Sequence, residues 1–289
     1  MMHRMKTDVP ESLIIIAGRH AYPVMLAKAA RDAGVQRIAV LGFKGETHRE
    51  IIPFVDEMYW MHLGSMRALL DKLGGLGIKH CMMVGQIAPH NLFQVRMDKL
   101  ALEMYRALEV RNAHTIFGAI VGEIEKLGIQ VLPGNAFMAC YTPDAGQLSR
   151  RTPTEREQTD IELGLKLVKG TSDFEIGQTV AIKDGLIIAV EALEGTNQTI
   201  KRAGKVGKAG TVIVKVPKVG HDMRFDIPVV GAKTFKIMKK AKVSCLAVEA
   251  GKTILLEKEK LIALANQYGM AFVAVRTDSL TTEDERAQR

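Results

Sequence analysis

The chain has 289 residues, of which 47% are hydrophobic and 25% charged, and its formal net charge is +8. This length is typical of about two globular domains, and no run approaches the roughly 18 consecutive apolar residues that a membrane-spanning helix needs. The positive charge fits three kinds of partner: nucleic acid, an anionic membrane surface, or a phosphate-rich small substrate. Because aromatic residues make up only 5% of the chain, we expect no nucleic-acid partner that stacks bases on aromatic rings.

The N-terminal residues and the cysteines indicate the cellular compartment of the protein. The first ten residues lack the apolar core of a secretory signal, so we expect a cytoplasmic protein. Cys81, Cys140 and Cys245 are odd in number and far apart, which excludes a disulfide framework and a CxxC metal motif. We therefore expect three reduced thiols that fill core space.

Short apolar runs alternate with amphipathic segments in the first half of the chain. The predicted strands cover residues 13–17, 38–41, 78–84 and 129–132. The predicted helices cover residues 23–33, 66–73, 98–110 and 116–127. Since strands and helices alternate, the pattern predicts a doubly wound parallel sheet, a Rossmann-like domain over residues 1–141.

A polar stretch with Pro143 and Gly146 predicts a linker over residues 142–152. The next pattern, Thr152 to Glu155, has the form of a capping box with proline at the first helical position. It predicts a helix that continues to about residue 169.

The second half is expected to be a mixed α/β domain over residues 153–275, which we take as the catalytic domain. Two hairpins are predicted, one from residues 178–183 and 186–191 around Asp184-Gly185, the other from residues 244–248 and 253–256. The remaining predicted elements are strands at 211–216 and 270–275 and a helix at 259–268. The polar residues 276–289 are predicted to be a disordered tail.

Two strand ends in the first half are candidate phosphate-binding loops. Gly18 and Arg19 stand between a strand and a helix N-terminus, where backbone N–H groups and a guanidinium can meet a phosphate. Gln86 follows Gly85 at the end of another strand, the edge at which open α/β sheets bind ligands. Ordinary tight turns are the structural alternative for both loops.

A second candidate site follows the strand that ends near Glu191. Two carboxylates, a glycine and two short polar side chains leave an apolar run together, namely Glu191, Glu194, Gly195, Thr196 and Asn197. Two acids three residues apart are suited to holding a hard cation or to binding sugar or ribose hydroxyls. The alternative is a charged loop that only terminates the hairpin.

A third candidate site follows the strand that ends near Lys215. In an extended segment Asp222, Arg224 and Asp226 would share one face, since side chains alternate. Two carboxylates and a guanidinium on one side can bind Mg²⁺, activate water and neutralise a phosphoryl transition state. A structural network of ion pairs is the alternative.

The lysines concentrate in two stretches, residues 201–208 and 233–242. The plain interpretation of both stretches is a solvated basic face. The hypothesis of a nucleic-acid partner is supported by this charge alone. The hypothesis of an NAD-type oxidoreductase is supported by the predicted parallel sheet alone. The missing GxGxxG argues against the oxidoreductase.

Longer strings resemble a known family. DFEIGQTVAIKDGLIIAVEALEGTNQTIKR, TVIVKVPKVGHDMRFDIPVVGAKTF and CLAVEAGKTILLEKEKLIALANQYGMAFVAV resemble the C-terminal domain of the LpxI-type UDP-2,3-diacylglucosamine pyrophosphatases. LIIIAGRHAYPVMLAKAARDAG and MMVGQIAPHNL look like that family's N-terminal domain. The resemblance covers residues 12–275.

The resemblance implies hydrolysis of a nucleotide-sugar lipid to 2,3-diacylglucosamine 1-phosphate (lipid X) and UMP, with Mg²⁺, in lipid A synthesis. It also implies a cytoplasmic enzyme in peripheral contact with the inner-membrane surface, and it leaves the oligomeric state open. The matching positions are Gly18, Gln86, Gln178, Glu191, Glu194, Gly195, Thr196, Lys215, Asp222, Arg224 and Asp226. We expect Asp222 closest to the chemistry, with Asp226 second, and Glu191, Glu194 and Asp222 as metal ligands.

The chain departs from the family pattern at three places. Asn197 replaces the acid of EGTD, His221 replaces the glutamine of QDxRxDxP, and Arg19 and His20 follow Gly18. These changes motivate an alternative function, a catalytically silent or altered-substrate homologue that binds a nucleotide-sugar lipid as a regulatory module. In the leading hypothesis the end of the Glu191 strand and the segment through Asp226 converge around a diphosphate.

Overall fold

The computed structural model describes residues 9–87 and 96–277. These residues form two compact units. Unit 1 comprises the chain up to Met138 together with Asp222–Asp226, and unit 2 comprises Ala139–His221 and the residues from Ile227 onward. The main division falls between Met138 and Ala139, whereas the sequence analysis placed the end of the first domain at residue 141 and a linker at 142–152. Asp222–Asp226, however, was assigned to the C-terminal domain and belongs instead to unit 1.

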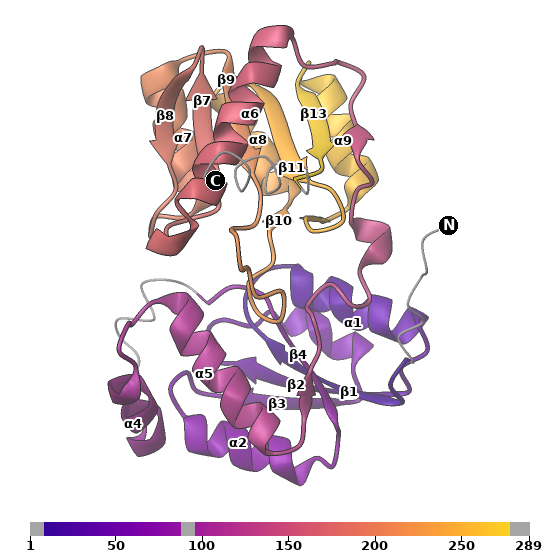
Figure 1. Ribbon diagram of the computed structural model, residues 1–289. Helices are drawn as coiled ribbons and strands as arrows, with labels where there is room; N and C mark the ends of the chain where they lie inside the picture. Colours follow the sequence, from indigo (N-terminus) through magenta and orange to yellow (C-terminus); the bar gives the residue numbers. More distant parts are fainter. Residues whose placement is uncertain (1–8, 88–95, 278–289) are drawn as a thin grey trace, which may run out of the picture. The chain divides into compact units, whose positions relative to one another are not determined.

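Unit 1 is built on a five-stranded parallel sheet in the order β3-β2-β1-β4-β5 (Figure 1). Its strands are β1 (Ser12–Ala17), β2 (Arg37–Phe43), β3 (Glu57–Met61), β4 (His80–Val84) and β5 (Gln130–Val131). The predicted doubly wound sheet is confirmed. The sequence did not predict β3, an edge strand whose residues are all only half-buried.

Helices cover both faces of this sheet. They are α1 (Tyr22–Asp32), α2 (Met66–Gly75), α4 (Lys99–Ala107) and α5 (Ala113–Lys126), with a 3-10 helix, η1, at Arg49–Phe54. Ile14, Ile16 and Cys81 pack into one core with α2 and α5. The alternate residues Leu13 and Ile15 point to the opposite face and are fully buried. Burial on both faces explains why these strands are continuous apolar runs.

Unit 2 contains a six-stranded mixed sheet in the order β6-β13-β11-β9-β7-β8. Its strands are β6 (Gly146–Gln147), β7 (Thr179–Lys183), β8 (Leu186–Val190), β9 (Thr211–Lys215), β11 (Val243–Glu249) and β13 (Ala271–Val275). The predicted β7–β8 hairpin is confirmed. The second predicted hairpin is wrong, because β12 (Ile254–Leu255) pairs in parallel with β10 (Val229–Val230) and not with β11.

The sheet of unit 2 lies between two helical layers (Figure 1). Its helices are α6 (Glu155–Gly170), α7 (Thr196–Gly207), α8 (Ala232–Lys240) and α9 (Lys258–Gln267), with 3-10 helices η2 (Ala139–Tyr141) and η3 (Ser172–Phe174). One face packs against α6, and the other packs against α7, α8 and α9. The two basic stretches therefore form most of α7 and α8, which the sequence did not predict to be helices.

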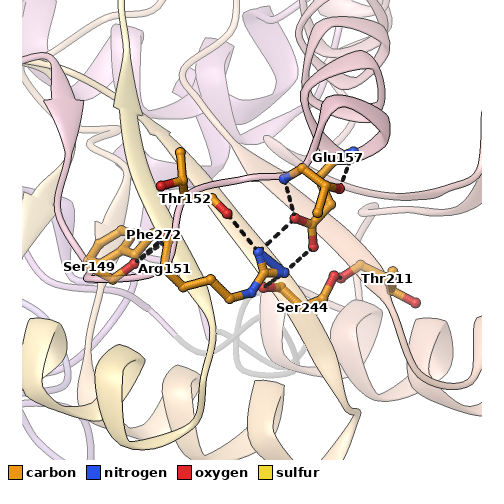
Figure 2. Close-up of polar contacts among 8 residues, drawn as sticks. Ser149, Arg151, Thr152, Glu157, Thr211, Ser244 and Phe272 are labelled. Atoms are coloured by element: carbon orange, nitrogen blue, oxygen red, sulfur yellow. Dashed lines mark hydrogen bonds and ion pairs between the residues drawn. The ribbon is translucent and has the colours of Figure 1, made fainter.

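Hydrogen bonds fix the stretch expected to be a linker within unit 2, as Figure 2 shows. Arg151 pairs with Glu157 through both terminal nitrogens, at 2.5 and 2.8 Å, and donates to the Ser244 carbonyl. The backbone N–H of Phe272 donates to Ser149 Oγ at 2.8 Å. The N-cap of α6 is Thr154 with Glu157 as reciprocal partner, so the capping box begins two residues later than predicted.

The cysteines differ in burial. Cys81 and Cys245 are buried, and burial raises the pKa of each thiol to about 12. Cys140 is exposed, so the expectation that it fills core space is wrong. Within residues 9–87 and 96–277, no helix combines the length and the apolar character that a bilayer crossing requires. Most of the predicted tail, from residue 278, lies outside the described residues.

Candidate active site

One edge of the unit 2 sheet gathers several of the predicted residues. Thr179 begins β7 directly opposite Lys215, which ends β9, because the two strands are antiparallel. Glu191 follows β8, and its N–H donates to the Thr179 carbonyl at 2.8 Å. Gln178 is next to Thr179, and its carbonyl accepts from the Val216 N–H at 3.1 Å. Residues at the ends of three strands, β7, β8 and β9, thus meet at one end of the sheet.

A chain of hydrogen bonds links three of these side chains, and we call Glu191, Thr196 and Lys215 the Glu191–Lys215 cluster. Lys215 Nζ donates to Thr196 Oγ1 at 2.7 Å, and that hydroxyl donates to Glu191 Oε1 at 3.0 Å. Glu191 and Lys215 are each only 7% exposed. Glu191 Oε2 is buried and has no hydrogen-bond partner among the described residues. Such an oxygen is costly to leave unsatisfied, so it points to a ligand or cation at this position.

The cluster lies at the N-terminus of α7. Gly195 is the N-cap residue with φ of +77°, and being a glycine it has no side chain that could cap the helix. The first-turn amides of a helix carry a partial positive charge, and of those in α7 the Gln198 N–H already donates to the Gly195 carbonyl at 3.1 Å. Together with the Lys215 ammonium they form a concentration of positive charge that suits a phosphate.

Glu194 and Asn197 are held by other groups. Glu194 Oε1 accepts from Arg202 at 2.5 Å, and Oε2 accepts from the Ala192 N–H at 3.1 Å. Burial alone would raise the pKa of Glu194, but the hydrogen bonds from Arg202 and the backbone outweigh it and lower the pKa. Thr234 Oγ1 donates to Asn197 Oδ1 at 3.1 Å, which ties α7 to α8.

Sequence reasoning missed Gly177, which makes room for Glu191. A Cβ at Gly177 would lie 2.2 Å from the Cγ of Glu191 and 2.8 Å from its Cδ, closer than real atoms approach. The Gly177 N–H also donates to the Glu191 carbonyl at 2.8 Å. The only sequence signal was a glycine directly before the strand of Gln178.

A second missed group is Glu249 at the end of β11, whose neighbour Val248 is in register with Lys215. Its buried carboxylate accepts from Lys169 at 3.0 Å, from Lys252 at 2.6 Å and from Thr277 at 2.7 Å. Burial would raise the pKa of Glu249, but these three donors together lower it. Because Lys169 Nζ also donates to the Pro217 carbonyl at 2.8 Å, the group fixes the segment that follows Lys215.

In unit 1, Asp222 and Arg224 form a close ion pair. Arg224 donates to Asp222 from Nη2 at 2.7 Å and from Nε at 3.0 Å, and Nη1 donates to Glu125 at 2.9 Å. The hydrogen bonds from Arg224 lower the pKa of Asp222, and Asp222 in turn raises the pKa of Arg224. The N–H groups of Phe225 and Asp226 both donate to the Asp222 carbonyl, so the segment is a turn. The expected extended segment with Asp222, Arg224 and Asp226 on one face is therefore wrong.

Phe225 anchors this turn in unit 1. Its ring lies 5.8 Å from the Phe117 ring and 5.6 Å from the His114 ring, measured between centroids. The carbonyl of Met223 accepts from the Gly134 N–H at 2.8 Å. The position of Asp222 is thus fixed by both apolar packing and hydrogen bonds.

The two predicted loops of unit 1 lie side by side. The Gly18 N–H donates to the Val84 carbonyl at 2.8 Å, and the Arg19 N–H donates to the Gln86 carbonyl at 2.7 Å. These two amides, which we expected to face a phosphate, are already engaged. A Cβ at Gly18 would lie 2.7 Å from the Gln86 carbonyl oxygen, so the glycine permits the close approach of the loops. Ala88 and Pro89 of the second loop lie outside the described residues.

The expected metal ligands do not form a preformed site in either unit. In the part of the chain that the structure describes, no three His, Cys, Asp or Glu side chains gather in a way that could hold a metal ion. Glu194 is engaged by Arg202 and Asp222 by Arg224. Of the three expected ligands, only Glu191 keeps a carboxylate oxygen without a hydrogen bond among the described residues.

These features define a two-unit α/β protein with a buried cationic and carboxylate cluster suited to phosphate chemistry. The model for the LpxI N-terminal domain matches residues 12–140, and the model for the LpxI C-terminal domain matches residues 144–273. The chain belongs to the LpxI family. It is 24% identical over 274 residues to the UDP-2,3-diacylglucosamine pyrophosphatase LpxI of Caulobacter vibrioides, which covers 90% of this chain and 96% of that protein.

Similarity to solved structures is weak. Phosphoribosylglycinamide synthetase from Anaerococcus prevotii matches at 15% identity and a TM-score of 0.26, over 65% of this chain and 42% of that one. The biotin carboxylase domain of Hydrogenobacter thermophilus 2-oxoglutarate carboxylase matches at 12% identity and a TM-score of 0.26, over 68% of this chain and 41% of that one. The chain thus spans less than half the length of both, and at such low TM-scores neither bears on the function of this chain.

Proposed function

We propose that this chain hydrolyses the pyrophosphate of UDP-2,3-diacylglucosamine, releasing UMP and 2,3-diacylglucosamine 1-phosphate in the cytoplasm. The support is its relation to a named pyrophosphatase along nine-tenths of its length. The structural observation that carries the proposal is the buried Glu191–Lys215 cluster at the N-terminus of α7. A lysine, a helix N-terminus and a carboxylate oxygen that has no hydrogen bond among the described residues together match a diphosphate and its counter-ion.

Lys215 and the first-turn amides of α7 would bind oxygens of the diphosphate. Lys215 is almost fully buried, so its charge acts through little water and is worth more than a surface charge. During hydrolysis a bond forms between a water oxygen and phosphorus, the bridging P–O bond breaks, and negative charge moves to the departing phosphate. The attacking water loses a proton to the surrounding solvent. A fixed ammonium beside that phosphate stabilises the charge as it develops.

Asp222 would orient the attacking water. Its pKa is lowered by Arg224, so it is ionised at neutral pH and a weak base. A carboxylate of this kind suits accepting a hydrogen bond from water better than storing the water's proton. Arg224 touches Asp222 and Glu125 and is a positioning residue in this scheme.

Magnesium is part of the proposal because the resemblance implies it. Mg²⁺ commonly binds through one or two carboxylates plus substrate phosphates, so it does not require a preformed cage of protein ligands. Glu191 Oε2 is the described carboxylate oxygen best placed to complete such a site. Addition of EDTA should abolish turnover, and addition of Mg²⁺ should restore it. Full turnover in the presence of EDTA would show that hydrolysis does not require a metal ion.

The activity test is the release of UMP from radiolabelled UDP-2,3-diacylglucosamine by the pure protein with Mg²⁺. We expect release well above a blank and a large loss in Asp222→Ala. No release above the blank, or an Asp222→Ala rate equal to that of the wild type, would refute the proposal.

A catalytically silent binding module is the second candidate function. The observation that favours it is Asn197, a neutral residue in place of the family's acid, whose Oδ1 is engaged by Thr234. Calorimetry with the same substrate separates the two functions. Binding without UMP release identifies a module, and binding with release identifies the enzyme.

A further inference from the structure

The layer of unit 2 formed by α7 and α8 has a strongly basic surface. Neither helix contains an aspartate or a glutamate. We call five exposed lysines on them the α7–α8 basic face: Lys201, Lys205, Lys233, Lys236 and Lys240. This clustering of one charge sign is not expected of an ordinary solvated face, where acids and bases alternate.

The burial pattern shows that these lysines point outward on both helices. On α7, Ile200 and Ala203 are buried in the core, which turns Lys201 and Lys205 toward solvent. On α8, Phe235 and Met238 are buried in the same core. The helices are neighbours in one layer, as Figure 1 shows, and a Cβ at Gly204 of α7 would lie 2.6 Å from the Cβ of Ala241, the C-cap of α8. The five lysines therefore form one surface.

The charges of this face are not neutralised within the described residues, where none of the five lysines forms an ion pair with a carboxylate. On the opposite face of the sheet, α6 carries Glu155, Glu157, Asp160 and Glu162 beside its bases. There Arg156 pairs with Asp184 at 3.1 Å. The imbalance is thus local to α7 and α8 and does not simply follow from the net charge of the chain.

Exposed apolar side chains accompany the lysines. Val206 of α7 is 63% exposed, and Leu186 at the start of the neighbouring edge strand β8 is 67% exposed. Ile188 lies against Gly207 of α7, with a side-chain atom 3.2 Å from where a Cβ would be. Leu186 is the cross-strand partner of Lys183, whose Nζ donates to the Gly207 carbonyl at 2.8 Å, so Leu186 lies on the side of the sheet that faces α7. Lysines and apolar side chains together are the composition of a surface that contacts lipid.

We propose that the α7–α8 basic face docks unit 2 onto the surface of an anionic phospholipid bilayer. Five lysines that form no ion pair with a carboxylate in residues 9–87 and 96–277 complement anionic headgroups, and Val206 and Leu186 supply apolar contact. A nucleic-acid partner is less favoured because the one aromatic residue of these helices, Phe235, is fully buried and cannot stack on bases.

The surface is connected to the candidate active site through α7. Thr196 of the Glu191–Lys215 cluster is the first residue of α7, and Lys201 and Lys205 follow it by about 8 and 14 Å along the helix axis. Docking would therefore hold this cluster near the headgroup level, where a lipid-linked substrate presents its phosphates. The docking proposal does not require the proposed hydrolysis, since vesicle binding is measured without turnover.

The test is flotation of the full chain with vesicles of phosphatidylglycerol and phosphatidylcholine, compared with vesicles of phosphatidylcholine alone. The variant Lys205→Gln/Lys233→Gln/Lys236→Gln removes three charges of the face. The control Lys99→Gln/Lys166→Gln/Lys260→Gln removes three exposed lysines elsewhere, so both variants have the same net charge. Circular dichroism confirms that each variant is folded.

We expect binding to the anionic vesicles, weakened by 0.5 M salt. The basic-face variant should bind at least tenfold more weakly, since each lysine near such a surface contributes roughly a fivefold effect, and the control should stay within about twofold of the wild type. Equal weakening of both variants would show that only net charge matters and would overturn the proposal. Absence of vesicle binding, or salt-sensitive binding to a homopolymer RNA but not to vesicles, would also overturn it.

Discussion

The two units differ in how their candidate site carboxylates, Asp222 and Glu191, are hydrogen-bonded. Asp222 in unit 1 is held by Arg224, which is itself held by Glu125, so its charge is compensated before any ligand arrives. Glu191 in unit 2 is more deeply buried, yet one of its oxygens lacks a partner among the described residues. The difference indicates that the Glu191–Lys215 cluster is built to receive a ligand, whereas the Asp222 turn is built to hold one carboxylate in a fixed orientation.

Removal of the Lys215 charge should have the largest effect of the changes considered, because it removes the cation of the Glu191–Lys215 cluster. Lys215→Met keeps much of the side-chain volume and loses the ammonium, so kcat/KM for UMP release should fall on the order of 100-fold or more. The matched control is Lys166→Met, an exposed lysine of α6, which should retain the wild-type rate. A Lys215→Met rate within threefold of the wild type would show that the cluster does not act on the phosphate.

A substitution at Gly177 that displaces the Glu191 side chain should have the next largest effect on activity. Gly177→Ala places a methyl group against the Glu191 side chain, so the protein should lose about 1–3 kcal/mol of unfolding free energy and at least tenfold in activity. Gly170→Ala is the control, because a Cβ there meets nothing within 4 Å. Denaturant titrations and UMP release measure both quantities, and equal behaviour of the two variants would contradict the packing described for Glu191.

The Asp222–Arg224 pair should show a defined pH dependence of stability. The pKa of Asp222 is lowered in the folded protein, so its stabilising effect is present above the unfolded value and is lost as the pH falls through the lower folded pKa. Asp222→Asn should therefore be less stable than the wild type by roughly 1 kcal/mol at neutral pH, since both side chains are partly exposed. This difference should shrink only below about pH 4. A difference that is constant down to pH 2 would show that the pair does not contribute in this way.

Substitution of Glu125, the second carboxylate that pairs with Arg224, should have the smallest effect on stability. Glu125→Gln weakens the pair with Arg224, in which the glutamate side chain is 44% exposed, so the loss in unfolding free energy should stay below about 1 kcal/mol. Thermal melts of this variant and of Asp222→Asn compare the two partners of Arg224 directly. A larger loss in Glu125→Gln than in Asp222→Asn would make Glu125, and not Asp222, the principal partner of Arg224.

The sequence predicted the elements whose pattern reflects local physics. The strands of unit 1 are apolar runs because both faces are covered, and the β7–β8 hairpin is marked by Asp184-Gly185 at its turn. Helices α7 and α8 were missed because only a narrow strip of each faces the core, and lysines occupy most other positions. The sequence analysis predicted the wrong partner for β12. Its actual partner, β10, is a two-residue strand about 25 residues earlier in the chain and has no recognisable strand pattern.

The candidate site shows the same limit. Glu191 and Thr196 were predicted in one motif and Lys215 in another, and only the sheet register brings the three into one hydrogen-bonded cluster. The assignment of Asp222–Asp226 to unit 1 depends on Phe225, which packs with residues about 110 positions earlier in the chain. Gly177 acts only through the space it leaves, which sequence alone does not express.

The most direct test of the central claim is a crystal structure of the protein with a non-hydrolysable analogue of UDP-2,3-diacylglucosamine. We expect a phosphate oxygen within hydrogen-bonding distance of Lys215 Nζ and the first-turn amides of α7, with Glu191 Oε2 facing the ligand or its cation. Phosphates bound elsewhere, with Lys215 and Glu191 in contact with neither ligand nor cation, would contradict the account.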